Sequence, residues 1–521
     1  MAIIKELKIH PAIGVARIGN HSTEFYIGPE VPNGFIKPDE IGGFKSADIS
    51  DNNALKIKRQ GARFRIFAYY DDGQIKELNS DNAEIIWHVK IANTKARGHG
   101  FYGVNKPEDP LRNSFVVNEV DRKNLALEPN EISISGKGNS VAFQKVKFRV
   151  KETDGTILSS DDILLGECKT DEKGRLIVLG GFGHTGAVKD HRINRYDDND
   201  YWYDDIADGY VKAQVKIIET GEKMDATDAW VLCAPPKYVP AMKTVVTLYD
   251  TLFNKHWHDG SIQADEKPKF YRDIYPIIRS ANNIPQLHKM TGHFSLAALL
   301  KPDSPLPLRK KFYDKLRKPD GSGDPNSNMP KMFGDGYDSN SSTMLTLTPY
   351  QLLILSQWKE GDVEIDDIKN SLPSSKITPA GLDRAALENC IGGAFFPGIE
   401  ASWFLRDKYQ FSTPFRLDSS QIKPGDVTKQ MALPWQADFL ACAKESTFDG
   451  VIAWWVFARP DDVFFEGDAA MHAWTPKNEF RSGEEGYQDM VDKWMKLGFI
   501  IEKDGKYVEV QRQISPNPPD I

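Results

Sequence analysis

The chain has few cysteines, and the four that it contains are widely separated. Cys168, Cys233, Cys390 and Cys442 form no CxxC pair and no Cys/His pair at the spacing of zinc ligands. This spacing argues against a disulfide framework and against a structural zinc site. Each cysteine taken alone is most simply explained as a small buried hydrophobic residue.

Long hydrophobic runs and a signal sequence are also absent. No window of the chain stays apolar for the ~18 residues that a membrane-spanning helix requires. The opening sequence MAIIKELKIHPAIGVARIG has neither a long apolar segment nor a small-residue cleavage site. We therefore expect no membrane association, and a location either in the cytoplasm or outside the cell without a standard signal peptide.

The chain has no excess of positive charge. Its 66 Lys and Arg residues are outnumbered by 74 Asp and Glu residues, which gives a formal net charge of -8. A mildly acidic chain without a basic stripe lacks the electrostatic footprint of a nucleic-acid-binding protein. Nucleic acid is therefore not an expected partner.

Clusters of metal ligands are not evident in the sequence. The segment HWHDG places His256 and His258 two residues apart, which is a spacing found in some metal sites. No further histidine or carboxylate nearby completes a coordination shell. We predict no metal site.

Hydrophobic periodicity divides the chain into two parts. Residues 1–255 contain short alternating runs such as FRIFAYY and AEIIWHVKIA, separated by Gly, Asp and Asn clusters, which predict a β-rich, sandwich-like part. In residues 256–521, TPYQLLILSQWKEGD and TPAGLDRAALENC have helical periodicity and begin with Thr-Pro, which is typical of a helix start. We predict an α+β protein with a β-rich domain over 1–255 packed on a mixed, largely helical domain over 256–521.

An acid, a cysteine and two tryptophans occur together in the segment that begins LPWQADFLAC. Asp438 and Cys442 are four residues apart, so on a helix their side chains lie on one face about a turn from each other. Trp454 and Trp455 follow in WWVFARP, which has the composition of a strand. Adjacent strand residues point to opposite sides, so only one of these tryptophans can face the pocket of Cys442.

A thiol close to an indole has a chemical use that neither group has alone. If the indole is oxidised to an ortho-quinone and bonded to the sulfur, the protein acquires an electrophilic carbonyl that reacts with primary amines. Asp438 is then placed to take a proton from the substrate, and an apolar pocket would raise its pKa towards the working pH. On these residues alone, the ordinary alternative of a helix with a half-buried cysteine beside a tryptophan-rich core strand is the simpler explanation, because apolar helices and paired tryptophans are common in protein cores.

Further segments carry a resemblance to a known family. Together and in this order, the chain resembles the lysine ε-oxidase and glycine oxidase family of quinoproteins, which contain cysteine tryptophylquinone. The resemblance extends from about residue 8 to about residue 500 and is carried by IHPAIGVARIGN, GGFGHTG, YWYDDIADGYV, WVLCAPPKYVPAM, VVTLYD, CIGGAFFPGIE, LPWQADFLAC and WWVFARPDDV.

This resemblance implies roles for individual residues. Cys442 is expected to be the cross-linked cysteine, and Asp438 the acid that assists both cofactor formation and proton abstraction. Trp454 or Trp455 is expected to be the cross-linked tryptophan because this pair is closest to Cys442 along the chain. Trp494, in MVDKWMKLGFI, is the further alternative.

Three more residues are assigned to the substrate pocket. Cys390 in CIGGAFFPGIE resembles a cysteine near the active site that is not cross-linked, and Tyr203 in YWYDD resembles an aromatic residue that shapes substrate access. His184 in GGFGHTG is placed with them, although a histidine in such a turn is more often a hydrogen-bonded structural residue. The turn lacks the Lys of a phosphate-binding loop, so it is not expected to bind nucleotide.

The resemblance also implies an activity. The chain is expected to oxidise a primary amine, that of an amino acid above all, and to use dioxygen with release of hydrogen peroxide and ammonia. A separate flavoprotein is expected to mature the cofactor, and the protein is expected to form homo-oligomers. The alternatives are a family member without a mature quinone that binds a ligand or partner, and an oxidase of a larger or peptide-bound amine.

Overall fold

The computed structural model describes most of the chain. The described residues are 2–100, 111–287, 295–318, 329, 332, 334, 344–368, 376–393, 399–401, 403–406, 410–441, 446–448, 451–453 and 459–516. Within these ranges, no helix has the length and apolar character needed to cross a bilayer.

One large sheet dominates the N-terminal part. Strands β8 (Ala83–Ala92) and β17 (Ala207–Ile217) alternate buried and exposed residues, as the period-2 pattern predicts. The sheet is strongly curled: β9 (Ile132–Ser135) at one end of the strand order contacts β10 (Ser140–Ala142) and β13 (Gly166–Thr170) at the other end. Its other strands are β1 (Ile4–His10), β2 (Ile13–Arg17), β3 (Phe25–Ile27), β6 (Arg59–Tyr70), β7 (Ile75–Leu78), β14 (Leu176–Gly180) and β18 (Lys223–Ala234).

Short two-stranded pairs and a one-turn helix lie outside the large sheet. Five two-stranded pairs are β4 (Lys45–Asp48) with β5 (Ala54–Ile57), β11 (Arg149–Lys151) with β12 (Ile157–Ser159), β15 (Thr185–Ala187) with β16 (Trp202–Asp204), β19 (Phe411–Thr413) with β20 (Arg416–Leu417), and β21 (Ser446–Phe448) with β22 (Val451–Ala453). A one-turn helix, α1 (Glu119–Arg122), lies beside β11.

Helices dominate the part of the chain that follows. Thr348 and Thr378 cap α5 (Pro349–Glu360) and α7 (Pro379–Leu387) through their side chains, and Pro occupies the first turn of each helix, so the predicted Thr-Pro starts are confirmed. The other helices are α2 (Leu248–His258), α3 (Tyr275–Asn283), α4 (Leu306–Asp314), α8 (Trp435–Ala441) and α9 (Glu484–Lys493).

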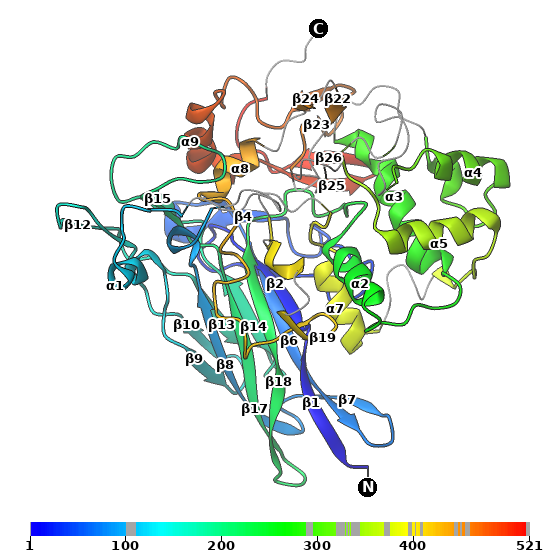
Figure 1. Cartoon of the computed structure of the whole chain (residues 1–521), viewed down its shortest axis with the longest axis horizontal. Helices are drawn as coiled ribbons and strands as arrows, with labels where there is room; N and C mark the ends of the chain where they lie inside the picture. Colours follow the sequence, from blue (N-terminus) through cyan, green and yellow to red (C-terminus); the bar gives the residue numbers. More distant parts are fainter. Residues whose placement is uncertain are drawn as a thin grey trace.

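A second, smaller sheet closes the C-terminal end. Its strand order is β24 (Met471–Ala473), β23 (Asp462–Phe465), β26 (Lys506–Val510) and β25 (Phe499–Lys503). In Figure 1 the large sheet extends towards the N-terminus, helices α2 to α5 form a separate lobe, and the small sheet lies with α8 and α9 at the opposite end. This arrangement confirms the predicted α+β class.

Helix α8 lies at the junction of the two parts. Ala437 of α8 packs into the core of the large sheet, whereas Phe439 and Leu440 pack into the core that the C-terminal elements share. Both sides of the helix are therefore buried. The predicted domain boundary at residue 255 stays a prediction, and these contacts mean that the two parts share core residues across it.

Candidate functional site

The N-terminus of α8 is anchored by a buried ion pair. The backbone N–H of Trp435 donates to Oδ2 of Asp204 at 3.2 Å, and Lys95 Nζ lies 2.5 Å from the same oxygen. The side chains of Asp204 and Lys95 are both fully buried. A carboxylate at a helix N-terminus is favourable because the first N–H groups of the helix have no partner within it. The anchor therefore fixes where α8 begins.

Asp438 is buried on α8 and paired with an arginine. Arg459 Nη2 donates to Asp438 Oδ2 at 2.6 Å, and each side chain is only 2% exposed. The guanidinium also lies over the ring of Phe439, 4.6 Å from its centroid. A cation at this distance favours the ionised carboxylate, which opposes the effect of burial. The sequence reading considered burial alone and did not assign a role to Arg459.

Part of the Arg459 guanidinium makes no hydrogen bond within the described part of the chain. Among the described residues, its Nε and Nη1 atoms are buried and make no hydrogen bond. Buried N–H donors of a charged group are normally satisfied, so these two mark a polar position beside Asp438. The run RPDD after the tryptophan pair was the sequence signal for this residue.

Aromatic side chains enclose the region around Asp438. The ring of Tyr238 lies 6.2 Å from that of Phe439 and 5.1 Å from that of Trp474, both in T-shaped contacts. Its hydroxyl donates to the carbonyl oxygen of Trp494 at 2.6 Å. The rings exclude water from this side of α8 and give it a low local polarity.

Trp494 packs against the helix that carries Asp438. It is 2% exposed and forms a T-shaped contact with Trp435, with ring centroids 5.4 Å apart. Trp494 directly follows α9, which packs along α8, and Gly486 of α9 leaves the space that Leu440 of α8 occupies. Figure 1 shows the two helices side by side, with β15 close to them.

The GGFGHTG segment forms a turn that lies on Trp494. Gly183 in this turn has φ +80°, and a Cβ there would overlap Cζ2 of Trp494 and approach Cη2 to 2.9 Å. At its far end, Thr185 is hydrogen bonded to Gln436 of α8, with Gln436 Nε2 2.9 Å from Thr185 Oγ1. The turn therefore contacts both the tryptophan and the helix, and only glycine fits at position 183.

A fully buried carboxylate, Asp205, holds the turn in place. Its Oδ2 accepts hydrogen bonds from the backbone N–H groups of Gly183 at 2.8 Å and His184 at 2.9 Å. Burial raises the pKa of Asp205 to about 7, and the nearby charge of Asp204 adds to this effect. Its Oδ1 is buried without a hydrogen-bond partner among the described residues. Sequence reasoning missed Asp205, although it follows the tyrosine of YWYDD.

Two of the three predicted pocket residues lie near this turn. His184 is part of it, and burial lowers the pKa of its imidazole, so the ring is neutral near pH 7. Tyr203 in β16 pairs with Gly186 in β15, and its ring lies 5.5 Å from that of Phe148. The β15–β16 hairpin thus places both residues next to the segment that contacts α8.

Cys390 lies in a different environment. Its Sγ donates to the carbonyl oxygen of Ala386 at 3.4 Å and lies 3.9 Å from Arg17 Nη2. Burial raises the pKa of the thiol to about 12, so it is not a thiolate at neutral pH. Its described contacts are with the core formed by α2, α7 and β18 rather than with α8.

The remaining predicted residues cannot be placed with respect to this arrangement. Cys442, Trp454 and Trp455 lie outside the described residues. Cys442 follows Ala441, the last residue of α8, by one position.

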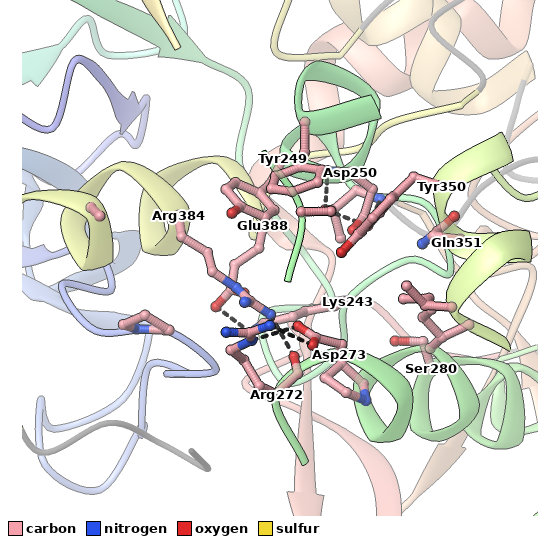
Figure 2. Close-up of a pocket in the computed structure, with 18 of the residues that line it drawn as sticks. Lys243, Tyr249, Asp250, Arg272, Asp273, Ser280, Tyr350, Gln351, Arg384 and Glu388 are labelled. Carbon is pink, nitrogen blue, oxygen red and sulfur yellow. Dashed lines mark hydrogen bonds and ion pairs between the residues drawn. The ribbon is translucent and has the colours of Figure 1, made fainter. Parts of the chain in front are cut away.

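A separate cavity of about 330 Å³ lies among the helices of the other lobe. Figure 2 shows its charged side chains, which are paired with one another: Arg272 with Asp273 at 2.7 Å, and Arg384 with Glu388 at 3.1 Å. Lys243 Nζ lies 2.5 Å from the same Glu388. The volume suits a small molecule. Among the described residues, Asp438, Tyr203, His184 and Cys390 do not line this cavity, and neither does any residue of α8.

Comparisons with known proteins match this chain along most of its length. The family model described as L-lysine epsilon oxidase N-terminal matches residues 10–233, and that of the L-lysine epsilon oxidase C-terminal domain matches residues 325–456. The L-lysine 6-oxidase of Marinomonas mediterranea is 28% identical, covering 84% of this chain and 71% of that protein.

Solved structures agree in fold. The L-Lys epsilon-oxidase from Marinomonas mediterranea superposes with a TM-score of 0.77 at 22% identity, covering 97% of this chain and 95% of that one. A structure of the same enzyme described as its Schiff base intermediate with L-Lys gives a TM-score of 0.76 with the same coverage.

Proposed function

The chain belongs to the L-lysine ε-oxidase family, and from this premise we propose that it oxidises a primary amine with a quinone built from its own Cys442 and a tryptophan. The quinone would supply an electrophilic carbonyl to the amine. Dioxygen is the proposed final electron acceptor, with hydrogen peroxide and ammonia as products. The observation that supports this most directly is the buried carboxylate of Asp438 on α8, which pairs with Arg459 and stands four residues before Cys442 in the sequence.

The described geometry supports Trp494 as the tryptophan, in preference to the pair at 454 and 455. Trp435, Asp438 and Cys442 stand at positions i, i+3 and i+7, so they share one helix face if α8 continues for one residue. Trp494 packs on Trp435, at the start of that face. Closeness along the chain was the only argument for Trp454 and Trp455.

The surroundings of Trp494 also fit an oxidised indole. Cζ2 and Cη2 are adjacent carbons of the six-membered ring, and an ortho-quinone needs two adjacent carbons. Gly183 presents only a bare Cα to this edge, where a Cβ would overlap Cζ2. A ring edge that gains oxygen atoms requires this kind of space.

Asp438 is the proposed general base. Its carboxylate would accept a proton from the carbon that bears the amine, at the oxygen that Arg459 does not bind. Arg459 holds the other oxygen, so the pair fixes the orientation of the carboxylate and keeps it ionised in a buried site. Phe439 and Tyr238 exclude water, which strengthens these interactions.

The amine of an amino acid is the proposed substrate. The curated relative is an L-lysine 6-oxidase, so L-lysine is the first amine to test, followed by glycine and by peptides with a free lysine side chain. A flavoprotein that matures the cofactor and a homo-oligomeric state are further parts of the proposal, both from the family resemblance.

Peptide mapping tests the proposal. The chain is co-expressed with a candidate maturation flavoprotein and digested with trypsin. Cys442 then lies in peptide 430–444, Trp494 in peptide 494–496, and both Trp454 and Trp455 in peptide 445–477. A covalent pair of 430–444 with 494–496 that carries added oxygen is the expected result.

Other outcomes would change the proposal in defined ways. A pair of 430–444 with 445–477 would keep the oxidase and move the quinone to a tryptophan of that peptide, Trp454, Trp455 or Trp474, which fragmentation of the pair would distinguish. A free Cys442 thiol with unmodified tryptophans after co-expression would refute the quinone. A family member that binds a ligand without oxidising it would then be the better explanation.

A further inference from the structure

We propose that Asp205 is a positioning residue that holds the 181–184 turn against Trp494, so that the bare Cα of Gly183 keeps the Cζ2–Cη2 edge of the ring open and correctly oriented. This inference deepens the proposed function and rests on Trp494 being the oxidised tryptophan. The inference adds a residue to the proposed function: Asp205 contacts the turn, and it acts on the ring of Trp494 only through that turn.

Contacts on two sides of the turn carry the inference. Oδ2 of Asp205 receives the N–H groups of Gly183 and His184, and the fit is tight because a Cβ on Gly181 would overlap the same oxygen. On the opposite side, Gly183 lies directly on the ring of Trp494. A shift of the carboxylate is therefore transmitted to the ring through a single residue.

The bonding of Asp205 differs from that of a purely structural buried acid. Asp208 is equally buried, but both of its oxygens are used: Oδ1 accepts from Thr428, and Oδ2 accepts from the indole N–H of Trp230. Asp205 leaves Oδ1 without a partner among the described residues, and no salt bridge to it is formed there. If Asp205 only had to accept these N–H groups, an asparagine could do so, and burying its neutral amide would cost less desolvation free energy than burying a carboxylate.

The charge state of Asp205 therefore determines how firmly the 181–184 turn is held. N–H donors bind a carboxylate more strongly than a protonated acid, so ionisation tightens the turn and protonation loosens it. The charged and titratable groups around it are Asp204, which is paired with Lys95, and Arg59, Cys233 and Tyr203. Because burial raises the pKa of Asp205 to about 7, its ionisation falls within the working range of the protein.

Two variants with matched controls test this. Asp205→Asn removes the charge but keeps an oxygen acceptor, and Asp208→Asn makes the same change at a buried site away from Trp494. Gly183→Ala places a methyl group against the ring, and Gly155→Ala makes the same change at a glycine with φ +90° and open space around it. The second control isolates the backbone strain of alanine at positive φ.

The first measurement needs no cofactor. In the chain expressed without its flavoprotein, hydrogen exchange of the peptide that contains 181–187 is expected to rise at least fivefold in Asp205→Asn at pH 8 and to stay unchanged in Asp208→Asn. Near-ultraviolet circular dichroism is expected to change in Gly183→Ala and to stay unchanged in Gly155→Ala. Unchanged exchange in Asp205→Asn would overturn the inference whatever the cofactor proves to be.

The second measurement uses the matured protein. Wild-type kcat is expected to rise with pH through about 7, and Asp205→Asn is expected to lose this inflection and to have a kcat about tenfold lower, with the cross-link still present. A wild-type pH profile in Asp205→Asn, with the cross-link on Trp494 confirmed, would overturn the inference and leave the proposed function intact. A cross-link on peptide 445–477 would instead overturn the choice of Trp494 and this inference with it.

Discussion

Replacing Arg459 by methionine removes the guanidinium that pairs with the buried carboxylate of Asp438. Two unit charges 4 Å apart interact by about 4 kcal/mol at an effective dielectric constant of 20. Breaking a buried pair by removing one partner costs about 3 to 5 kcal/mol. Since both side chains are buried and only 2.6 Å separates Nη2 from Oδ2, we expect Arg459→Met to lower the free energy of unfolding by about 3 kcal/mol.

Denaturant unfolding of the chain without its quinone, followed by tryptophan fluorescence, measures this loss. The double variant Asp438→Asn/Arg459→Met is expected to be more stable than Arg459→Met, because the buried negative charge that paired with Arg459 is removed as well. In the matured protein, Arg459→Met is also expected to lower kcat about 100-fold, since a carboxylate that becomes protonated cannot act as a base.

Arg65→Met is the control for this experiment. It breaks a mostly buried pair with Glu30, 2.9 Å away, on strand β6. It is expected to lower stability without the selective loss of kcat. A change in stability below about 1 kcal/mol in Arg459→Met, together with an unchanged kcat, would refute the role assigned to the pair.

Three further predictions concern the surroundings of α8. The pKa of Asp205 in the folded protein is raised to about 7, so ionisation of this carboxyl lowers the stability of the wild type as pH rises from 5 to 8. Asp205→Asn lacks this ionisation, and its melting temperature relative to wild type is therefore expected to increase from pH 5 to pH 8 in thermal scans. Asp204→Asn removes the negative charge that pairs with Lys95 and leaves one acceptor oxygen in place of two; we expect about 3 kcal/mol lower stability and less cross-linked Cys442 by peptide mapping, and a wild-type yield would refute the anchor. Cys390→Ala is expected to leave both the cross-link and kcat within about twofold of wild type, and a larger loss of kcat would place Cys390 in the site after all.

Local sequence patterns identified what depends on local geometry. Asp438 was expected on a helix and lies on α8, whereas its pairing with Cys442 four residues later stays a prediction. The Thr-Pro starts of α5 and α7 could be recognised because capping involves only neighbouring residues. The α+β class followed from the change of hydrophobic period along the chain.

Partners that are distant in sequence could not be found in this way. Arg459 is 21 residues from Asp438, and Asp205 is 22 residues from Gly183, with a hairpin between them. These separations along the sequence are far longer than the spacing of neighbouring side chains on one helix or one strand, so no periodic pattern connects the residues. Burial of Asp438 was therefore foreseen without its counter-ion, and the turn at 180–186 was foreseen without the carboxylate that holds it.

The proposed choice of tryptophan rests on packing, whereas the sequence prediction of Trp454 or Trp455 rested on distance along the chain. A cross-link needs two side chains in contact, and contact is decided by which elements pack together. Helix α9 packs along α8 and carries Trp494 at its end, although 51 residues separate Cys442 from this tryptophan along the chain. The turn at Gly183, which follows β14 of the large sheet, contacts the same ring. The proposed centre thus uses the junction between the two parts of the fold, and both parts must be folded before Cys442 and Trp494 can be brought together.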